Sequence, residues 1–176
     1  IRTKDKSEYR AFTAKKPEEE KAMWIEFLKW IETLTEPYQV IHYASYEKTR
    51  LAVLEKRYGG SEALDKFRNN MIDIKQILTH SIVLPLHFYG LKYAAPFLGF
   101  AWRSEVKSGG QSVDVFEKFL ETKNEELLKQ IILYNEDDVR ATAVVADWCR
   151  AYAMKSIEYN EPYPWQEGIE TGIYKK

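Results

Sequence analysis

The sequence predicts an α/β domain, in which helices flank a sheet. Strand-like and helix-like segments alternate over residues 9–58, and helical patterns dominate the second half. Such alternation is typical of layered α/β architectures. The 176 residues correspond to one ordinary domain, and 45% hydrophobic residues suffice for a full core. Because only two strands are clear, we expect part of the sheet to lie upstream of Ile1.

The alternating elements come first in the chain. The expected strands cover residues 9–14 and 39–43, and the expected helices cover residues 17–36 and 45–58. Side chains of residues 9–14 alternate between two faces, as they do in a strand. Pro17 suits the first turn of a helix and Gly59 suits the end of one, which supports these boundaries.

The second half is predicted to be mainly helical. The expected helices cover residues 61–70, 91–98, 113–120 and 125–152. Residues 71–78 fit either a strand or a helix, residues 82–88 are expected to be extended, and residues 101–112 are expected to form a polar loop. Residues 156–176 have no periodicity. We therefore divide the chain into a domain over residues 1–155 and an irregular tail over 156–176.

Charge and cysteine content narrow the class of protein. The net charge of −1 makes no case for nucleic-acid binding, although a local basic groove would suffice for it. The single cysteine, Cys149, leaves no partner for an intrachain disulfide and favours a reducing compartment. No apolar run is long enough to span a bilayer, and no signal peptide is visible. We expect a cytoplasmic protein that does not bind membranes.

The most informative motif combines a tyrosine with an acidic cluster. Tyr134 and Asp138 are four residues apart, so they share one face of a helix. A carboxylate can hold a cation while a phenol orients an attacking water. A second interpretation is structural: Asn135 would cap a helix whose first turn contains the acids, where the helix dipole favours them.

A second motif lies where the strand over residues 39–43 meets the following helix. Ligands of open α/β sheets collect at the carboxyl ends of strands, and Glu47 is placed there. The alternative is that Ser45 caps the helix and Glu47 is merely solvated. His42 alone is more often a satisfied, partly buried histidine than a ligand.

Asp73 is an acid within an apolar run, Met71 to Ile74. Burial of an unpaired acid is costly, so such a position indicates either a function or a specific partner. The alternatives are an exposed residue of an edge strand and a cap for the next helix, and the sequence does not separate these three.

Several stretches resemble one family, in the same order. His42 to Thr49 is similar to the middle motif, His-Asn-x-x-Phe-Asp, of DEDD-type 3′–5′ exonucleases, and Tyr134 to Asp138 matches their closing Tyr-x-x-x-Asp signature. Gly90 to Phe100 resembles the Ser-Leu-Lys helix of proofreading exonucleases. With Ser108 to Val113 included, the pattern is closest to the ribonuclease H-like domain of predicted RecB-type nucleases. The similarity covers residues 8–150.

The resemblance implies a ribonuclease H-like mixed sheet flanked by helices, here lacking its first strand or strands. It also implies a metal-dependent nuclease that hydrolyses DNA or RNA as a 3′–5′ exonuclease, with two divalent cations, Mg²⁺ or Mn²⁺. Asp138 and Glu47 would bind metal, and Tyr134 would orient the nucleophilic water.

Other residues take secondary roles in this interpretation. Tyr43, Tyr46 and Lys92 are the expected substrate-binding residues, although the two tyrosines would equally fit packing at the strand–helix junction. The second group of candidate site residues comprises Asp73, Asp137 and His42.

The chain departs from the family pattern in two ways. No Asp-x-Glu motif precedes Tyr9, and Glu47 replaces the usual aspartate. We expect single-stranded DNA or RNA as partner, a role with other nuclease or helicase domains in DNA repair, and dimerisation through an exposed sheet edge. The competing hypothesis is a non-catalytic nucleic-acid-binding or scaffolding module with a degenerate metal site.

Overall fold

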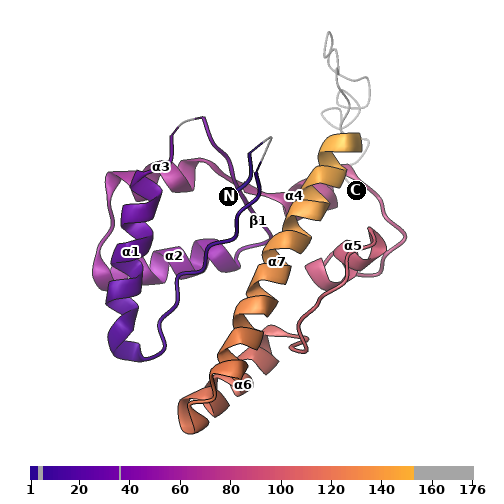
Figure 1. Cartoon of the computed structure of the whole chain (residues 1–176). Helices are drawn as coiled ribbons and strands as arrows, with labels where there is room; N and C mark the ends of the chain where they lie inside the picture. Colours follow the sequence, from indigo (N-terminus) through magenta and orange to yellow (C-terminus); the bar gives the residue numbers. More distant parts are fainter. Residues whose placement is uncertain (4–5, 36, 153–176) are drawn as a thin grey trace, which may run out of the picture.

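The computed structural model describes residues 1–3, 6–35 and 37–152, and the expected tail lies outside them. Figure 1 shows α7 running the length of the molecule, with α1, α2 and α3 on one side and α5 on the other. The elements are the short 3-10 helix η1 (Pro17–Glu19), α1 (Glu20–Glu32), β1 (Val40–His42), α2 (Tyr46–Tyr58), α3 (Glu62–Asn69), β2 (Met71–Asp73), α4 (Ile74–Ser81), α5 (Leu91–Phe97), α6 (Gly109–Thr122) and α7 (Glu125–Tyr152).

The sheet of the described residues has two strands. β1 and β2 are parallel, with Val40 opposite Met71 and His42 opposite Asp73. The crossover between them is made by α2 and α3, as in α/β folds. The ambiguous residues 71–78 therefore divide into a strand and a helix. The described part of the chain is thus mostly helical, with a small parallel sheet in place of the mixed sheet that we expected.

The strand expected over residues 9–14 is wrong. This segment has no strand partner among the described residues, and a strand forms only where a neighbour accepts and donates its backbone hydrogen bonds. Side chains hold the segment instead. The Tyr9 hydroxyl donates to Asn135 Oδ1 at 3.0 Å, and the Phe12 ring packs edge-on against Phe27 with centroids 5.5 Å apart.

Residues 82–88 do not form a strand either. The Leu84 amide donates to the hydroxyl of Tyr89 at 2.7 Å, so a side chain takes the place of a strand partner. Pro85, which lacks an amide proton, follows directly.

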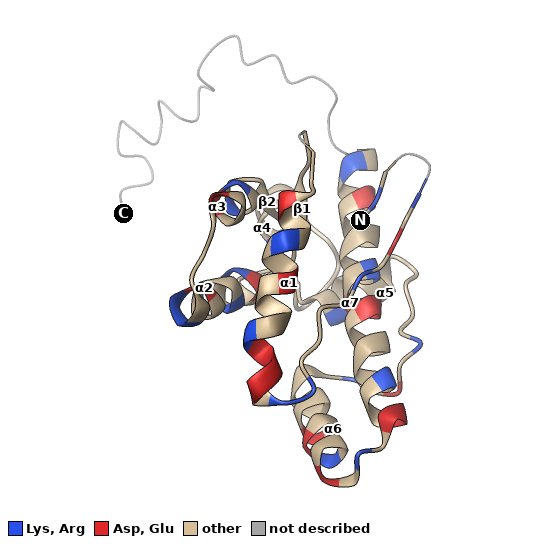
Figure 2. Cartoon of the chain, turned by 60° about the vertical axis from the view of Figure 1, so that its left-hand side comes forward, with Lys and Arg blue, Asp and Glu red and all other residues tan. Residues whose placement is uncertain are grey.

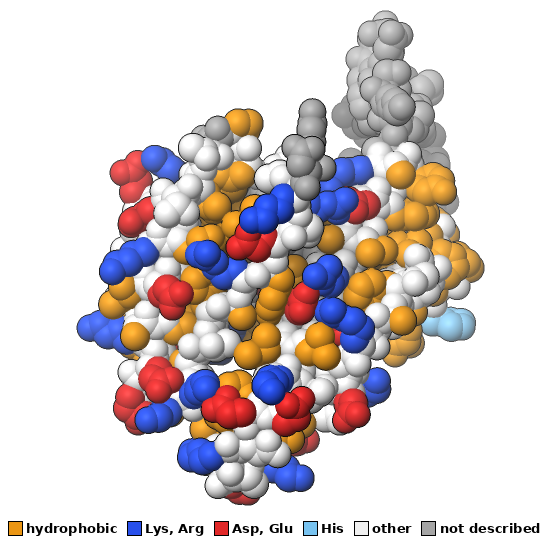
Figure 3. Space-filling model, viewed as in Figure 1, with side chains coloured by type: hydrophobic (Ala, Val, Ile, Leu, Met, Phe, Trp, Pro, Cys, Tyr) orange, Lys and Arg blue, Asp and Glu red, His pale blue; other side chains and the backbone are white. Residues whose placement is uncertain are grey.

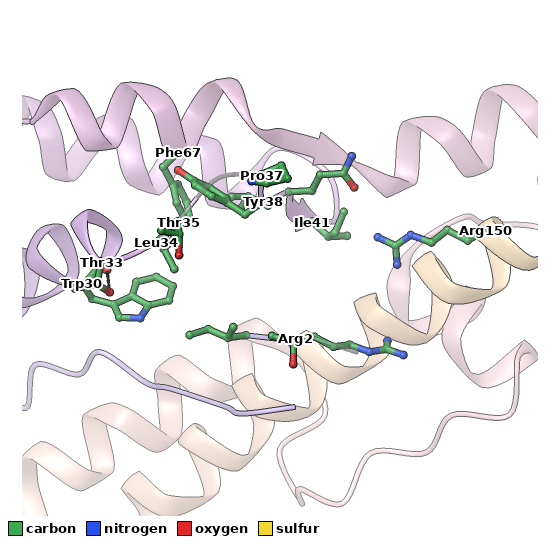
Figure 4. A pocket seen from close by; sticks show the side chains of 14 residues that line it. Arg2, Trp30, Thr33, Leu34, Thr35, Pro37, Tyr38, Ile41, Phe67 and Arg150 are labelled. Carbon is green, nitrogen blue, oxygen red and sulfur yellow. Dashed lines mark hydrogen bonds between the residues drawn. The ribbon is translucent and has the colours of Figure 1, made fainter. Parts of the chain in front are cut away.

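Residues of β1 line two cavities. One, of about 770 Å³, is lined by Ile41, by the end of α1 and by Arg2 and Arg150 (Figure 4). The other, of about 580 Å³, lies between residues 9–14, β1, α2 and α7. Among the described residues, β1 pairs with β2 alone, and it also borders both cavities. This arrangement fits a sheet that is incomplete in this chain.

The small sheet separates two hydrophobic cores. Ile41 and Ile72 face a core built from α4, α5 and α7, whose fully buried members include Leu78 and Val145. Val40 faces the other core, built around Trp24 and its neighbours on α1, α2 and α3. Because α7 packs against β1, α5 and α6, it carries its side chains to the carboxyl end of β1.

The described helices include none that is long and apolar enough to cross a membrane. In Figure 2, Lys and Arg positions (blue) and Asp and Glu positions (red) are mixed along the helices. Their mixture agrees with the near-zero net charge, so any nucleic-acid site must depend on local groups rather than on a strongly basic face.

Candidate functional site

The Tyr134–Asp138 motif lies in the middle of α7. The helix is continuous from Glu125 to Tyr152, so the interpretation of Asn135 as a helix cap is wrong. One helical turn separates Tyr134 from Asp138, and the Asp138 carboxylate is near enough to help raise the pKa of the Tyr134 hydroxyl. Tyr134 and Asp138 therefore share one face of α7, as their spacing predicted, and their catalytic roles stay predictions.

The Asp138 carboxylate has two further partners, from distant parts of the chain. Its Oδ1 atom accepts hydrogen bonds from Trp102 Nε1 at 2.8 Å and from Lys92 Nζ at 3.1 Å. The Lys92 ammonium also lies 3.7 Å from the ring centroid of Trp102 and 4.3 Å from that of Tyr134. Loss of water around the ammonium lowers the pKa of Lys92, and the bond to Asp138 opposes this shift.

Burial, with the nearby charge and hydrogen bond of Asp138, raises the pKa of Tyr134 to about 12. Its hydroxyl therefore stays protonated at neutral pH. Tyr134 can orient a neighbouring oxygen as a hydrogen-bond donor, but it cannot act as a base there.

Glu47 lies at the start of α2 and is within electrostatic range of Asp138. Loss of water around the carboxyl is the main cause that raises its pKa, and the negative charges of Asp73 and Asp138 add to it, against an opposing effect of His42. Nδ1 of His42 lies 3.9 Å from Glu47. Glu47 and Asp138 therefore influence each other electrostatically, and their convergence on one metal site stays a prediction.

His42 is buried at the end of β1. Its Nδ1 is 2.7 Å from the carbonyl oxygen of Ala44, so Nδ1 carries a proton and donates to this carbonyl. Nε2 is buried and has no hydrogen-bond partner. His42 thus has an unpartnered ring nitrogen beside the cavity that β1, α2 and α7 line.

Asp73 has the capping role that was one of its three interpretations. Its Oδ1 accepts from the amide of Lys75 at 2.9 Å, which starts α4, and from the amide of Ala44 at 3.0 Å. The second bond ties the end of β2 to the end of β1. Ala44 has a positive φ of 65°, so this bond also supports a backbone conformation that is rare for alanine.

The two candidate stacking residues are placed very differently. Tyr43 is buried in the core, and its hydroxyl donates to the carbonyl of Tyr89 at 2.7 Å, so its ring is not available to a base. Tyr46 is 71% exposed at the start of α2. Of the two, only Tyr46 offers a ring to a ligand.

Asp137 is a structural anchor. It is fully buried, and it accepts hydrogen bonds from the backbone amides of Arg103 and Ser104 and from the Arg103 guanidinium. Burial alone would raise its pKa, but these bonds outweigh burial and hold the pKa below its usual value. Asp137 therefore fixes the loop that carries Trp102.

Trp102 is the site residue that the sequence interpretation missed. It lies in the segment expected to be a polar loop, and it contacts Asp138 from 36 positions away in the chain. The signal was a large aromatic residue beside Arg103 in an otherwise polar stretch, which indicates that part of the loop is packed.

Two buried phenols predict sensitivity to alkali. The pKa values of Tyr43 and Tyr134 are both raised to about 12, chiefly by burial. The unfolded chain ionises its phenols near pH 10, so it binds fewer protons above that pH, and stability falls as the pH rises from about 10 to about 12. In urea unfolding between pH 8 and 11, Tyr43→Phe and Tyr134→Phe should each flatten this decline. Tyr152→Phe, which changes an exposed phenol, should leave the decline as it is in the wild type. Equal slopes in the wild type and all three variants would contradict the raised pKa values of Tyr43 and Tyr134.

The described residues do not complete a site for a divalent cation. Among them, no three His, Cys, Asp or Glu side chains come close enough together to hold a metal. Asp138 has one oxygen occupied by Lys92 and Trp102, and Asp73 is engaged in capping. The chain supplies candidate ligands in Asp138 and Glu47, and a metal would need others.

Comparison with known protein families gives one match. The model of the RNase_H superfamily matches residues 1–150. No curated protein and no solved structure shows significant similarity to the chain. The superfamily implies an α/β fold, nucleic-acid binding and, typically, the use of divalent metals. Since the match covers most of the 176 residues, this chain belongs to the ribonuclease H superfamily.

Proposed function

We propose that this protein is a metal-dependent nuclease that hydrolyses phosphodiester bonds of DNA or RNA as a 3′–5′ exonuclease. One observation supports the proposal: in a chain of the ribonuclease H superfamily, the negative charge of Asp138 on α7 helps to raise the pKa of Glu47 on α2. Bringing these groups together across some ninety residues of sequence is what a shared site requires.

Each residue has a role that suits its chemistry. Asp138 and Glu47 would supply carboxylate oxygens, which Mg²⁺ and Mn²⁺ prefer as ligands, alongside carboxylates from outside the described residues. Bound divalent cations stabilise charge on the reacting oxygens of a phosphodiester. Tyr134 would hold an oxygen in place through its protonated hydroxyl. Tyr46, exposed beside Glu47, would stack on a base of a single strand.

The proposal is tested with single-stranded DNA and RNA oligonucleotides labelled at the 5′ end. With Mg²⁺ or Mn²⁺, the complete protein should shorten the labelled strand progressively from its 3′ end. The products should then form a ladder of 5′-labelled fragments. A single internal cut would point to an endonuclease, and intact substrate under all conditions would contradict nuclease function.

Tyr134→Phe is expected to slow cleavage while metal binding persists. The substitution removes only the hydroxyl, which is not a strong metal ligand, and positioned hydroxyls contribute on the order of 10²-fold to such reactions. Single-turnover cleavage rates measure the first effect, and Mn²⁺ titration followed by electron paramagnetic resonance measures the second. A variant that cleaves at the normal rate would show that the phenol has no part in the reaction.

A second candidate function is a nucleic-acid-binding or scaffolding module without catalysis. Lys92 and Trp102 both donate hydrogen bonds to the Asp138 carboxylate. Because a metal would need this carboxylate, these bonds favour the alternative. Apolar side chains also gather over α5 in Figure 3. Tyr93 and Phe97 of α5 are exposed, and the exposed Phe88 packs against Tyr93. Exposed apolar patches mark interaction sites. In the same assay, this alternative predicts retarded migration of the labelled strand with no shortening.

A further inference from the structure

The outer face of α5 is apolar, and the described part of the chain leaves it exposed. Ala94 and Ala95 are fully buried towards α7, whereas Tyr93 and Phe97 are 54% and 48% exposed. Lys92 is the only charged residue of the helix. A helix that is apolar on all sides is normally buried, so the outer face of α5 is suited to an interaction.

Three exposed rings, those of Phe88, Tyr93 and Phe97, form what we call the aromatic surface (Figure 3). Phe88 belongs to the loop before α5 and is 63% exposed, and its ring centroid lies 5.6 Å from that of Tyr93. Phe97 follows Tyr93 by one helical turn, which places both on one side of α5. An added Cβ at Gly90 would lie 3.4 Å from the Tyr93 ring, so this ring rests against the backbone. Contacts thus hold the rings of Phe88 and Tyr93 in place while more than half of each residue stays exposed.

The segment around the aromatic surface contains no acidic residue. Residues 74–104 include three Lys and Arg residues and no Asp or Glu, although the whole chain has a net charge of −1. Two of these cations, Lys92 and Arg103, are paired with Asp138 and Asp137. A polyanion on the rings would therefore meet no repelling carboxylate of this segment, but it would gain little from charge attraction. Its affinity would come mainly from contact with the rings.

We propose that the aromatic surface binds single-stranded nucleic acid by stacking of its bases on Phe88, Tyr93 and Phe97. Every base has a flat face, so exposed rings hold a strand with little regard for its sequence. An acid-free segment in a chain of the ribonuclease H superfamily favours this ligand over a protein partner. The inference rests on the proposed function only in the class of ligand, since stacking needs neither metal nor cleavage.

The aromatic surface adjoins the candidate site. Lys92 precedes Tyr93 in α5, and its Nζ atom lies 3.1 Å from Asp138 Oδ1. A strand stacked on Tyr93 would therefore lie near Asp138. Tyr46 starts α2, which lies on the other side of α7 from α5 (Figure 1), so Tyr46 and the aromatic surface would contact different parts of one strand.

The test is the fluorescence anisotropy of labelled oligothymidylate and oligouridylate with the complete protein, in the presence of a chelator so that no strand is cleaved. Phe88→Ala and Tyr93→Ala should each weaken binding about tenfold, which is within the range for the loss of one stacked base. Tyr93→Phe keeps the ring and should bind like the wild type. An abasic strand of the same length should bind the wild type weakly, and Tyr93→Ala should weaken that binding no further.

Two control variants separate stacking from a general effect. Val83→Ala changes a 95% exposed aliphatic residue of the loop before α5, and Tyr152→Ala removes an exposed ring at the end of α7. Both should bind like the wild type, and thermal unfolding checks that each variant is folded. All variants should keep the salt dependence of the wild type, since none of them removes a cation that could contact a phosphate.

The outcomes distinguish this proposal from the nuclease function. If the alanine variants of the aromatic surface bind single strands as tightly as the wild type, or if the abasic strand binds as tightly as the complete one, the proposal is wrong even if the protein is a nuclease. If sedimentation shows that the wild type dimerises and Tyr93→Ala does not, while both bind strands equally, the surface binds a second copy instead. If stacking is found and no protein cleaves nucleic acid, this proposal stands and the nuclease function fails.

Discussion

Asp137→Asn is expected to lower the free energy of unfolding by about 3 kcal/mol. The substitution removes the charge of a fully buried carboxylate. The single amide oxygen of Asn can accept from the two backbone amides or from the Arg103 guanidinium, but not from both sides, so at least one buried donor loses its acceptor or faces the new NH₂ group. Removing one partner of a buried ion pair costs about 3–5 kcal/mol, and the lower end applies because Arg103 is half exposed. Urea unfolding measures the change. Asp147→Asn, the same change on the surface of α7, should cost no more than about 1 kcal/mol.

The free energy of unfolding should depend on pH differently in the wild type and in Asp137→Asn. The pKa of Asp137 is lower in the folded chain than in the unfolded chain, so its contribution to stability is present above about pH 4 and is lost as the pH falls through the folded value. The wild type should therefore lose stability more steeply than Asp137→Asn as acid is added below pH 4. If stability falls equally steeply with pH in both proteins, the Asp137 carboxylate is not charged and paired as described.

Asp138→Asn is expected to reduce nuclease activity on the order of 10³-fold while the fold persists. Metal-ion catalysis supplies several kcal/mol of transition-state stabilisation, and each 1.4 kcal/mol is about tenfold in rate. The pair with Lys92 is partly exposed, so its loss should cost only about 1 kcal/mol of stability. Cleavage rates and thermal unfolding are measured on the same preparation.

The contrast with Asp137 makes this prediction specific. The two carboxylates are adjacent in sequence, yet one should control stability and the other activity. If Asp138→Asn mainly lowers the melting temperature and leaves cleavage unchanged, the acidic cluster is structural, and the binding module becomes the better explanation.

Local patterns in the sequence were enough to predict most helices. The apolar spacing of α1, the glycine that ends α2 and the long periodic stretch of α7 all depend on neighbouring residues, and each element was found close to its observed bounds. The start of α6 was placed four residues too late, because Ser108, whose side chain accepts from the Gln111 amide, was not recognised as its cap.

Strands were harder because they depend on partners. Residues 9–14 alternate like a strand, but no described strand lies beside them, so the pattern alone misled. Residues 71–78 could not be assigned from their composition. The pairing of Met71 with Val40 and the cap that Asp73 provides decide where the strand ends and α4 begins.

In the candidate site, too, contacts between neighbouring residues could be predicted and contacts between distant segments could not. The spacing of Tyr134 and Asp138 revealed their shared helix face, since that depends only on helix geometry. The contacts of Lys92 and Trp102 with Asp138 depend on how α5 and a loop pack on α7, which no local pattern encodes. Burial likewise separates Tyr43 from Tyr46, which were both expected to bind substrate, and it separates the fully buried Asp137 from Asp138.

The most direct test of metal-dependent nuclease function is the rate at which the complete protein releases nucleotides from a labelled single strand, first after treatment with a chelator and then with Mn²⁺ restored. We predict no release after chelation and recovery of release as Mn²⁺ is added, with Asp138→Asn inactive throughout. Release that continues in the chelator, or that is equally fast in Asp138→Asn, would contradict the proposed function.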